Sequence, residues 1–164
     1  MIKAHRLTRV GLPAIEFIMR VPHRIAMVWE TAAAQEGLSR WFPAPVDYER
    51  HEGGLVRFGR DPLRLGSDGV VTELLPGRRL AFAWGRNEIR LSMTPIDGTT
   101  DLVFINRLGH EREEARNAAV WHAALLRLGS LLDVRWPQED VHSLYAQYVE
   151  HGYRQGARMP EAAA

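Results

Sequence analysis

The chain has 164 residues, of which 46% are hydrophobic and 25% charged, so it is long enough to bury one core without metals or disulfides. It has no cysteine, which excludes disulfides, thiolate metal sites and a thiol nucleophile. Its net charge of +1 differs from the strongly positive charge of most nucleic-acid-binding domains. Lys3 is the single lysine, which argues against Schiff-base catalysis. The sequence lacks a run of apolar residues long enough for a membrane span or a signal peptide, and we expect a cytoplasmic protein.

The N-terminal third predicts one strand and two short helices. Residues 1–12 have no clear period, and we expect an N-terminal extension there. Apolar and polar residues then alternate from Ala14 to Val21, which is typical of a strand. Apolar residues at steps of three and four from Ile25 to Ala32 predict a helix, and a short second helix follows at 38–42.

The middle of the chain predicts strands joined by short turns. Pro76-Gly77 and Asp97-Gly98 are turn signals, and the second stands between two alternating runs, as in a hairpin. Consecutive strands with short connections favour an antiparallel meander. The predicted strands are Val46–Arg50, Leu55–Phe58, Val70–Leu75, Leu80–Trp84, Ile89–Met93 and Thr99–Arg107.

The C-terminal third is helical. Residues 111–133 predict a long helix with a wide apolar stripe and glutamates in its first turn, where the helix dipole favours them. A shorter amphipathic helix is expected at 137–151.

We therefore predict an α+β fold, in which a curved antiparallel sheet of about seven strands wraps around the long helix. The expected divisions are an extension (1–12), the domain (13–134), an additional helix packed on the domain or at a dimer seam (135–153) and a tail (154–164).

Five segments, in this order, resemble the SRPBCC (START-like) superfamily, and most closely its branch named after the activator of the 90-kDa heat-shock-protein ATPase. They are Val28 to Pro43, Gly53-Gly54, Gly69 to Trp84, Gly98 to Asn106, and the pattern Trp121-x3-Leu125-x2-Leu128. The resemblance implies a helix-grip fold with a cavity between the long helix and the sheet, and ligands that are hydrophobic or polycyclic. It carries over no catalytic residue, because the family shares no catalytic motif.

One segment departs from the family pattern. Ala33-Ala34-Gln35 stands where such proteins usually have Thr-Asp-Pro before the second helix. The departure removes a helix N-cap and a proline suited to the first helical position, so we expect a softer helix break, or one shifted towards Gly37.

The sequence offers little for metal or nucleophilic chemistry. His110 and Glu114 share a helix face, but they give at most two ligands, whereas a catalytic zinc site usually needs three. No serine lies in a nucleophile elbow, and Gly53-Gly54 precedes a strand rather than a phosphate-binding helix. The arginines between Arg57 and Arg90 alternate with acids, which favours a solvated sheet face over a nucleic-acid groove. We expect no metal, no cofactor and no catalytic residue.

The candidate site is the expected cavity. Three polar residues on the inward side of strands, Tyr48, Thr72 and Asn106, are candidates to orient a ligand, with the alternative that each satisfies a neighbouring backbone group. Acids that would suit a cyclase or isomerase, namely Glu73, Glu88 and Asp101, fall on the outward side. The expected cavity lining comprises Trp29, Trp41, Phe42, Tyr48, Thr72, Phe82, Trp84, Leu91, Phe104, Asn106, Trp121 and Leu125.

The leading hypothesis is a protein that binds a small hydrophobic or aromatic ligand in this cavity without catalysis. One alternative is a protein-interaction module, either chaperone-related or homodimerising through the helix at 137–151. The family's chaperone-activating members carry an additional domain for which this chain has no room, so the sequence does not support a chaperone contact. A second alternative is an enzyme of the cyclase or isomerase type that uses the same cavity. We expect neither nucleic-acid binding nor membrane insertion.

Overall fold

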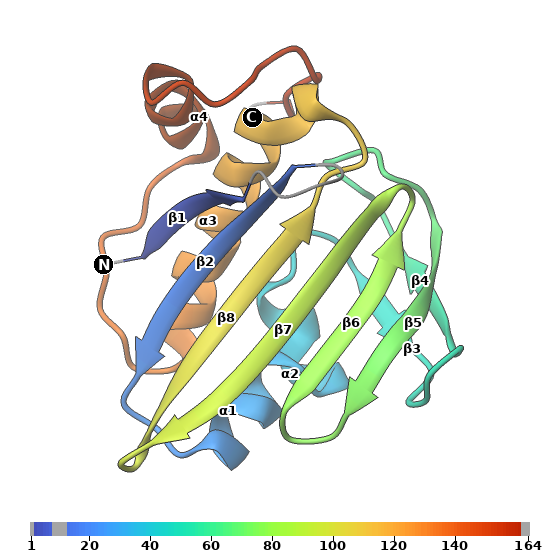
Figure 1. The fold of residues 1–164 in the computed structure, drawn as a ribbon, viewed down its shortest axis with the longest axis vertical. Helices are drawn as coiled ribbons and strands as arrows, with labels where there is room; N and C mark the ends of the chain where they lie inside the picture. The colour runs from blue at the N-terminus through green and yellow to red at the C-terminus, as the bar shows by residue number, and fades with distance from the viewer. Residues whose placement is uncertain (1, 8–12, 162–164) are drawn as a thin grey trace.

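A computed structural model describes residues 2–7 and 13–161, and within them one antiparallel sheet and four α-helices (Figure 1). The sheet has eight strands in the order β1-β2-β8-β7-β6-β5-β4-β3. The strands are β1 (Lys3–Leu7), β2 (Ala14–Val21), β3 (Val46–Tyr48), β4 (Leu55–Phe58), β5 (Asp68–Leu75), β6 (Arg79–Trp84), β7 (Asn87–Ile96) and β8 (Thr99–Arg107). The helices are α1 (Ile25–Ala32), α2 (Gln35–Trp41), α3 (Glu114–Leu131) and α4 (Val141–Glu150), and a short 3₁₀ helix, η1 (Glu111–Glu113), precedes α3.

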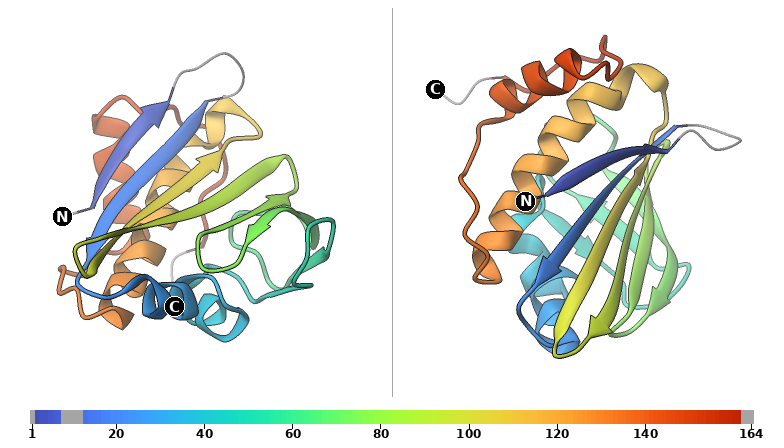
Figure 2. Two further views of the ribbon diagram at one scale, coloured as in Figure 1. Left: turned by 60° about the horizontal axis from the view of Figure 1, so that its bottom comes forward. Right: turned by 60° about the vertical axis from the view of Figure 1, so that its left-hand side comes forward.

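The helices lie on one face of the sheet. The strands curve around α3, while α1 and α2 cover one end of the same face and α4 packs on the outer side of α3 (Figures 1 and 2). This arrangement is the helix-grip fold predicted from the sequence. The sheet has one strand more than the predicted number of about seven, because β1 adds to its edge.

The core forms because apolar residues alternate on the inner side of the strands. In β2, Ile15, Phe17 and Met19 are at most 1% exposed, and the strand pairs with β8 along its whole length. The β7–β8 hairpin forms at the predicted turn, where Asp97 and Gly98 have φ of 46° and 81°. Positive φ at both turn residues matches the right-handed twist of the flanking strands, which explains the Asp-Gly pair.

The strand β1 is not among the elements predicted from the sequence. It pairs antiparallel with β2, from Lys3 opposite Ile18 to Leu7 opposite Ala14. Its exposed and half-buried residues do not alternate cleanly, because β1 is an edge strand with only part of one side covered. Residues 1 and 8–12 of the expected N-terminal extension lie outside the described part of the chain.

The expected shift of the helix break towards Gly37 is wrong, whereas the alternative of a softer break stays a prediction. The break falls at Ala33 and Ala34, and α2 begins at Gln35. Gln35 takes over as an anchor, because its side-chain Nε2 donates to the Val46 carbonyl at 2.6 Å and its Oε1 accepts from the Tyr48 amide at 3.0 Å. Gly37 lets α2 approach α1 closely, since a Cβ there would lie 2.1 Å from the Glu30 carbonyl oxygen.

The predicted inward side of β5 is wrong in its first half. A β-bulge between Val71 and Glu73 shifts the register, so that Val70 and Thr72 are exposed and Val71 is buried. Beyond the bulge, Leu74 packs against the core as expected, and Glu73 points outward. An extra residue in one strand reverses which side chains face the core, and alternation alone does not reveal where that happens.

The C-terminal segment is tied to the start of α3. The Arg154 amide donates to Glu114 Oε1 at 2.8 Å, and the Ala115 amide donates to the Arg154 carbonyl at 2.9 Å. Arg6 of β1 contacts the same Glu114 carboxylate at 2.6 Å. Glu114, which is 1% exposed, therefore joins α3, β1 and the C-terminal segment. Residues 162–164 of the expected tail lie outside the described part.

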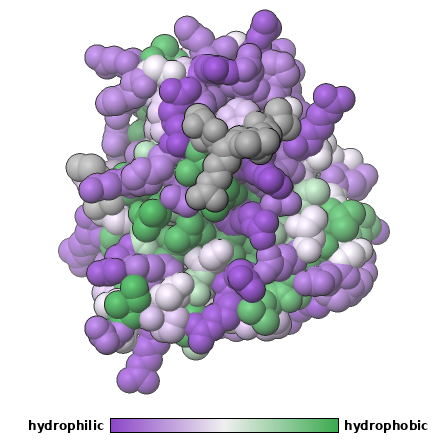
Figure 3. All heavy atoms as spheres, in the orientation of Figure 1, coloured by the Kyte–Doolittle hydropathy of each residue, from purple (hydrophilic) through white to green (hydrophobic). Residues whose placement is uncertain are grey.

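The outer face of the sheet carries ion pairs, and in Figure 3 hydrophobic patches lie among hydrophilic residues on this side of the molecule. Glu73 contacts Arg79 at 2.7 Å and Arg90 at 2.5 Å, and Arg20 pairs with Asp101 at 2.7 Å. Opposite charges are thus paired across neighbouring strands, as expected of a solvated face. Within residues 2–7 and 13–161, none of the helices has the length and apolar character needed to cross a membrane.

Candidate functional site

Aromatic side chains occupy the space between α3 and the sheet, where the cavity was expected. Trp121 of α3 lies with its ring centroid 4.6 Å from that of Phe104 and 5.1 Å from that of Phe42. Trp84 stacks on Phe58 at 4.3 Å with an interplanar angle of 10°. The predicted aromatic lining residues therefore do come together, but they pack against one another. Those with less than 8% exposure are Trp41, Phe42, Phe82, Trp84, Phe104 and Trp121.

The other predicted lining residues lie in different environments. Leu91 and Leu125 are buried in the same core, whereas Trp29 is only half-buried on α1. Tyr48 is buried and its hydroxyl donates to the Ala33 carbonyl at 2.7 Å, which is the backbone role considered as the alternative. Thr72 is exposed at the bulge and does not join the group.

Asn106 lies at the centre of a buried network of side-chain amides. Its Nδ2 donates to Asn87 Oδ1 at 2.9 Å, and its Oδ1 accepts from Asn117 Nδ2 at 2.9 Å and from Trp121 Nε1 at 3.1 Å. Asn87 in turn donates to Glu113 at 3.0 Å. The three asparagines are at most 2% exposed. Because these groups satisfy one another, the network holds α3 to β7 and β8 and leaves Asn106 no free group for a ligand.

A pocket of about 530 Å³ lies on the opposite side of α3, between β1, α3 and α4. Its floor is formed by the buried residues Ile2, Tyr148 and Tyr153 together with Ala4, so the surface is mainly apolar. Its polar lining residues are His122 and, at the edge, His5, Arg6, Gln147 and His151.

His122 is the most deeply placed polar group of this pocket. One ring nitrogen, Nδ1, lies 2.8 Å from the Tyr148 hydroxyl, and the ring meets Phe17 edge-on at 6.0 Å. Burial lowers the pKa of His122, with the charge of Glu139 opposing, so the imidazole is neutral near pH 7. Nε2 has no hydrogen-bond partner among the residues that the structure describes, so it is available to a ligand.

The edge of the pocket is held by charge and aromatic contacts. The Arg6 guanidinium carbon lies 5.1 Å from the Tyr153 ring centroid while the same group contacts Glu114. Tyr153 packs against Tyr148 with centroids 4.7 Å apart. Burial raises the pKa of both tyrosines, so their hydroxyls stay protonated and neutral.

The sequence patterns do not reveal this pocket because its walls come from three distant segments. Neither His122 nor His151 was among the predicted site residues, and β1 was not among the predicted strands. The available signal was the amphipathic pattern of 137–151, which places Tyr148 on the face that packs on α3. No group of three possible metal ligands occurs in the described ranges 2–7 and 13–161.

The lowered pKa of His122 predicts a pH dependence of stability. As the pH falls, His122 is protonated in the unfolded chain before it is protonated in the folded protein. The stability given by the neutral imidazole is therefore present above the ordinary pKa of 6.5. It is lost as the pH falls through 6.5 towards the lower pKa of the folded protein. Melting temperatures measured from pH 7.5 to 5 are expected to fall less in His122→Asn, which does not titrate but can still hydrogen-bond Tyr148.

The matched control for the pH experiment is His142→Asn, because His142 is exposed on α4. The titratable or charged groups around His122 are Glu139 and, in the pocket lining, His5, Arg6, Tyr148, His151 and Tyr153, and neither variant changes any of them. If the melting temperature fell equally steeply with pH in the wild type and in His122→Asn, His122 would not be the source of the pH dependence.

Comparison with known proteins agrees with this fold. The family model described as "Activator of Hsp90 ATPase homolog 1-like protein" matches residues 22–133. No curated protein matches the chain. Among solved structures, CalU16 from Micromonospora echinospora aligns with a TM-score of 0.72 and 20% identity over 92% of this chain and 94% of that chain.

Two further structures show the same fold. The conserved protein of unknown function EF2215 from Enterococcus faecalis has a TM-score of 0.74 and 16% identity over 91% of this chain and 90% of its own. The Aha1 dimer from Colwellia psychrerythraea has a TM-score of 0.59 and 17% identity over 75% of this chain and 98% of its own. The resemblance stated from the sequence is thus confirmed, and the chain belongs to the Aha1-like branch of the SRPBCC superfamily, the family described as activator of Hsp90 ATPase homolog 1-like proteins.

Proposed function

We propose that the protein binds a small, mostly apolar molecule in the pocket between β1, α3 and α4, and that it acts by binding rather than by catalysis. The observation that carries this proposal is the pocket itself, whose volume of about 530 Å³ lies in the usual range for small-molecule sites. An apolar floor with a few convergent polar groups is typical of sites that take hydrophobic ligands. His122 supplies the polar group that would orient such a ligand.

The proposal places the ligand on the β1 side of α3 rather than among the aromatic side chains on the other side. Phe42, Trp84 and Trp121 contact one another at centroid distances of 5.1–6.2 Å, so a ligand there would have to displace rings that pack together. A ligand on the β1 side displaces no ring, which favours that side.

The composition of the lining favours binding over a cyclase or isomerase reaction. Among the described residues, the pocket lining contains no carboxylate, and His122 is paired with a tyrosine rather than with an acid that would make it a stronger base. The acids Glu73, Glu88 and Asp101 lie in ion pairs on the outer face of the sheet.

The interaction-module alternative has less support. A solved relative is described as an Aha1 dimer, but in this chain α4 turns its apolar face towards α3. Leu144 is fully buried and Tyr148 is 8% exposed within one chain. This face is therefore already covered, and a dimer seam would need another surface.

The proposal is tested by filling the pocket. Thermal shifts are measured with a panel of fatty acids, sterols and polycyclic aromatic compounds, and at least one is expected to bind. At about 100 times its dissociation constant, a ligand adds about 2.7 kcal/mol and raises the melting temperature by about 5–10 °C. Ala4→Leu, which places a larger side chain in the pocket, is expected to abolish that rise.

Ala146→Leu is the matched control, since Ala146 is exposed on α4 and does not line the pocket. The rise is expected to persist in this variant. The absence of any shift across the panel, or a shift that is as large in Ala4→Leu as in the wild type, would contradict the proposal.

A further inference from the structure

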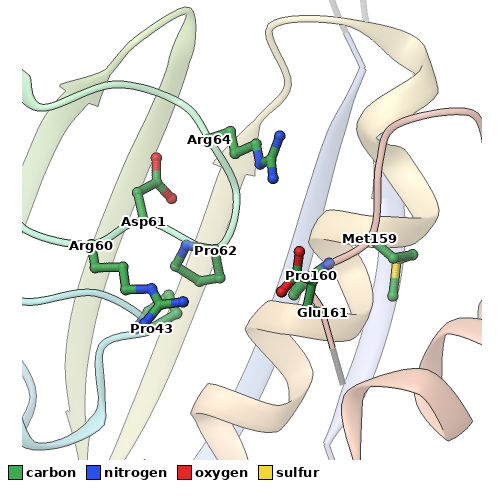
Figure 4. Close-up of a pocket in the computed structure, with 8 residues that line it drawn as sticks. All are labelled: Pro43, Arg60, Asp61, Pro62, Arg64, Met159, Pro160 and Glu161. Atoms are coloured by element: carbon green, nitrogen blue, oxygen red, sulfur yellow. The ribbon is translucent and has the colours of Figure 1, made fainter. Parts of the chain in front are cut away.

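A second pocket lies between the β4–β5 loop and the C-terminal segment (Figure 4). Its volume is about 350 Å³. Arg60, Asp61 and Arg64 contribute from the loop, and Glu161 contributes from the C-terminal segment. The pocket thus combines guanidinium groups of the loop with a carboxylate of the chain's own end.

Among the described residues, the two loop arginines Arg60 and Arg64 have no polar partner. Neither guanidinium group makes an ion pair or hydrogen bond with any residue in the described ranges. Figure 4 shows Arg64 reaching from the loop towards the C-terminal segment. Arg64 also has φ of 53°, a left-handed conformation that costs a residue with a side chain about 1–3 kcal/mol and is often found at functional sites.

The loop that carries these arginines is rigidly built. The Asp61 carboxylate accepts hydrogen bonds from the backbone amides of Leu63, Leu65 and Gly66. Leu63 is fully buried, and Trp84 Nε1 donates to the Gly66 carbonyl at 2.9 Å. Because the Asp61 oxygens are occupied by the loop backbone, this carboxylate does not neutralise Arg60 or Arg64 by a direct hydrogen bond.

The C-terminal segment supplies the one carboxylate that can leave the pocket. Glu161 faces the loop and has only a loose contact with Arg158, at 3.7 Å. The segment is anchored further back, where the Ala157 amide donates to the Arg112 carbonyl at 3.2 Å. Glu161 can thus move away while the rest of the segment stays in place.

We propose that this pocket is a binding site for a small organic carboxylate, held by Arg60 and Arg64, and that the Glu161 side chain competes with the ligand. A guanidinium group matches the planar carboxylate. The rings of Pro43, Pro62 and Pro160 offer apolar contacts to the ligand body. A phosphate, with a charge of about −1.5 to −2, fits less well, because Asp61 stays close and repels the larger charge. This site is independent of the apolar pocket proposed above.

The test is a titration of the ¹⁵N-labelled protein with sodium benzoate at constant ionic strength. The reporter is the indole N–H resonance of Trp84, which senses the loop through its hydrogen bond to Gly66. We expect a saturable shift of this resonance. The double variant Arg60→Gln/Arg64→Asn is expected to bind benzoate at least tenfold more weakly, and asparagine suits the left-handed backbone at position 64.

Two further arms make the result decisive. Arg57→Gln/Arg78→Gln removes the same charge from exposed positions outside the pocket and is expected to leave the affinity unchanged. Glu161→Gln keeps both pocket arginines and the proline rings, removes the competing charge, and is expected to bind benzoate severalfold more tightly. Inorganic phosphate is expected to bind at least tenfold more weakly than benzoate.

Any of three outcomes would overturn the proposal. They are equal affinity in the two double variants, no gain of affinity in Glu161→Gln, and phosphate binding as tight as that of benzoate. Glu161→Gln tests the competition without changing either arginine, so the proposal stays falsifiable even where the double variant folds poorly.

Discussion

Replacing Trp121 by alanine is expected to lower the free energy of unfolding by about 3–5 kcal/mol, the usual range for removing a buried tryptophan. The side chain is fully buried, and its ring lies within 6.2 Å, centroid to centroid, of those of Phe42, Trp84 and Phe104. Its removal leaves a hole at the centre of the aromatic group and deprives Asn106 of the indole donor. Urea denaturation followed by circular dichroism measures the loss.

The same variant tests whether the space between α3 and the sheet can hold a ligand once a ring is removed. Indole has the shape of the missing side chain, and it is expected to restore part of the lost stability of Trp121→Ala while leaving the wild type unchanged. Trp29→Ala is the control, because Trp29 is only half-buried, and we expect it to cost less than half as much. Equal losses in the two variants would contradict the central role of Trp121.

Replacing Asn106 by leucine is expected to cost about 2–4 kcal/mol, although the two side chains are similar in size, because buried donors lose their acceptor. Trp121 Nε1 loses the acceptor at 3.1 Å, and Asn117 Nδ2 keeps only its contact with Asn87 at 3.1 Å. If the burial of apolar surface alone decided the stability of the core, Asn106→Leu would raise the free energy of unfolding. The free energy of unfolding, measured by urea denaturation, decides between the two.

A double-mutant cycle isolates the cause. Phenylalanine at position 121 has no N–H group, so Asn106→Leu is expected to cost about 1 kcal/mol less in a Trp121→Phe background than in the wild type. If Asn106→Leu lowered the free energy of unfolding equally in both backgrounds, the indole–amide hydrogen bond at 3.1 Å would contribute nothing to stability.

Much of the fold could be predicted from the sequence because local patterns determine most of its elements. Alternation from Ala14 to Val21 and the Asp97-Gly98 turn produced a strand and a hairpin where they were expected. The long helix begins as η1 at Glu111 and continues as α3 from Glu114, close to the predicted start. Periodicity works here because one face of each element is buried against the same core.

The errors have a common physical origin in contacts between distant segments. The bulge in β5 turns Thr72 outward, and its position depends on how β5 pairs with β6. The helix α2 begins at Gln35 without a side-chain cap, and Gln35 instead hydrogen-bonds the backbone of β3. Local sequence carries no direct signal of either contact.

By itself, the sequence determined the fold class, the family and the set of large aromatic residues that face inward. Those properties follow from hydrophobic burial, which depends on the order and spacing of apolar residues along the chain. The tertiary structure alone decided that Trp84 and Trp121 fill the space between helix and sheet, and that β1, His122 and Tyr148 meet in a pocket on the other side. Whether apolar side chains line a space or fill it depends on packing among segments far apart in the sequence, which periodicity does not encode.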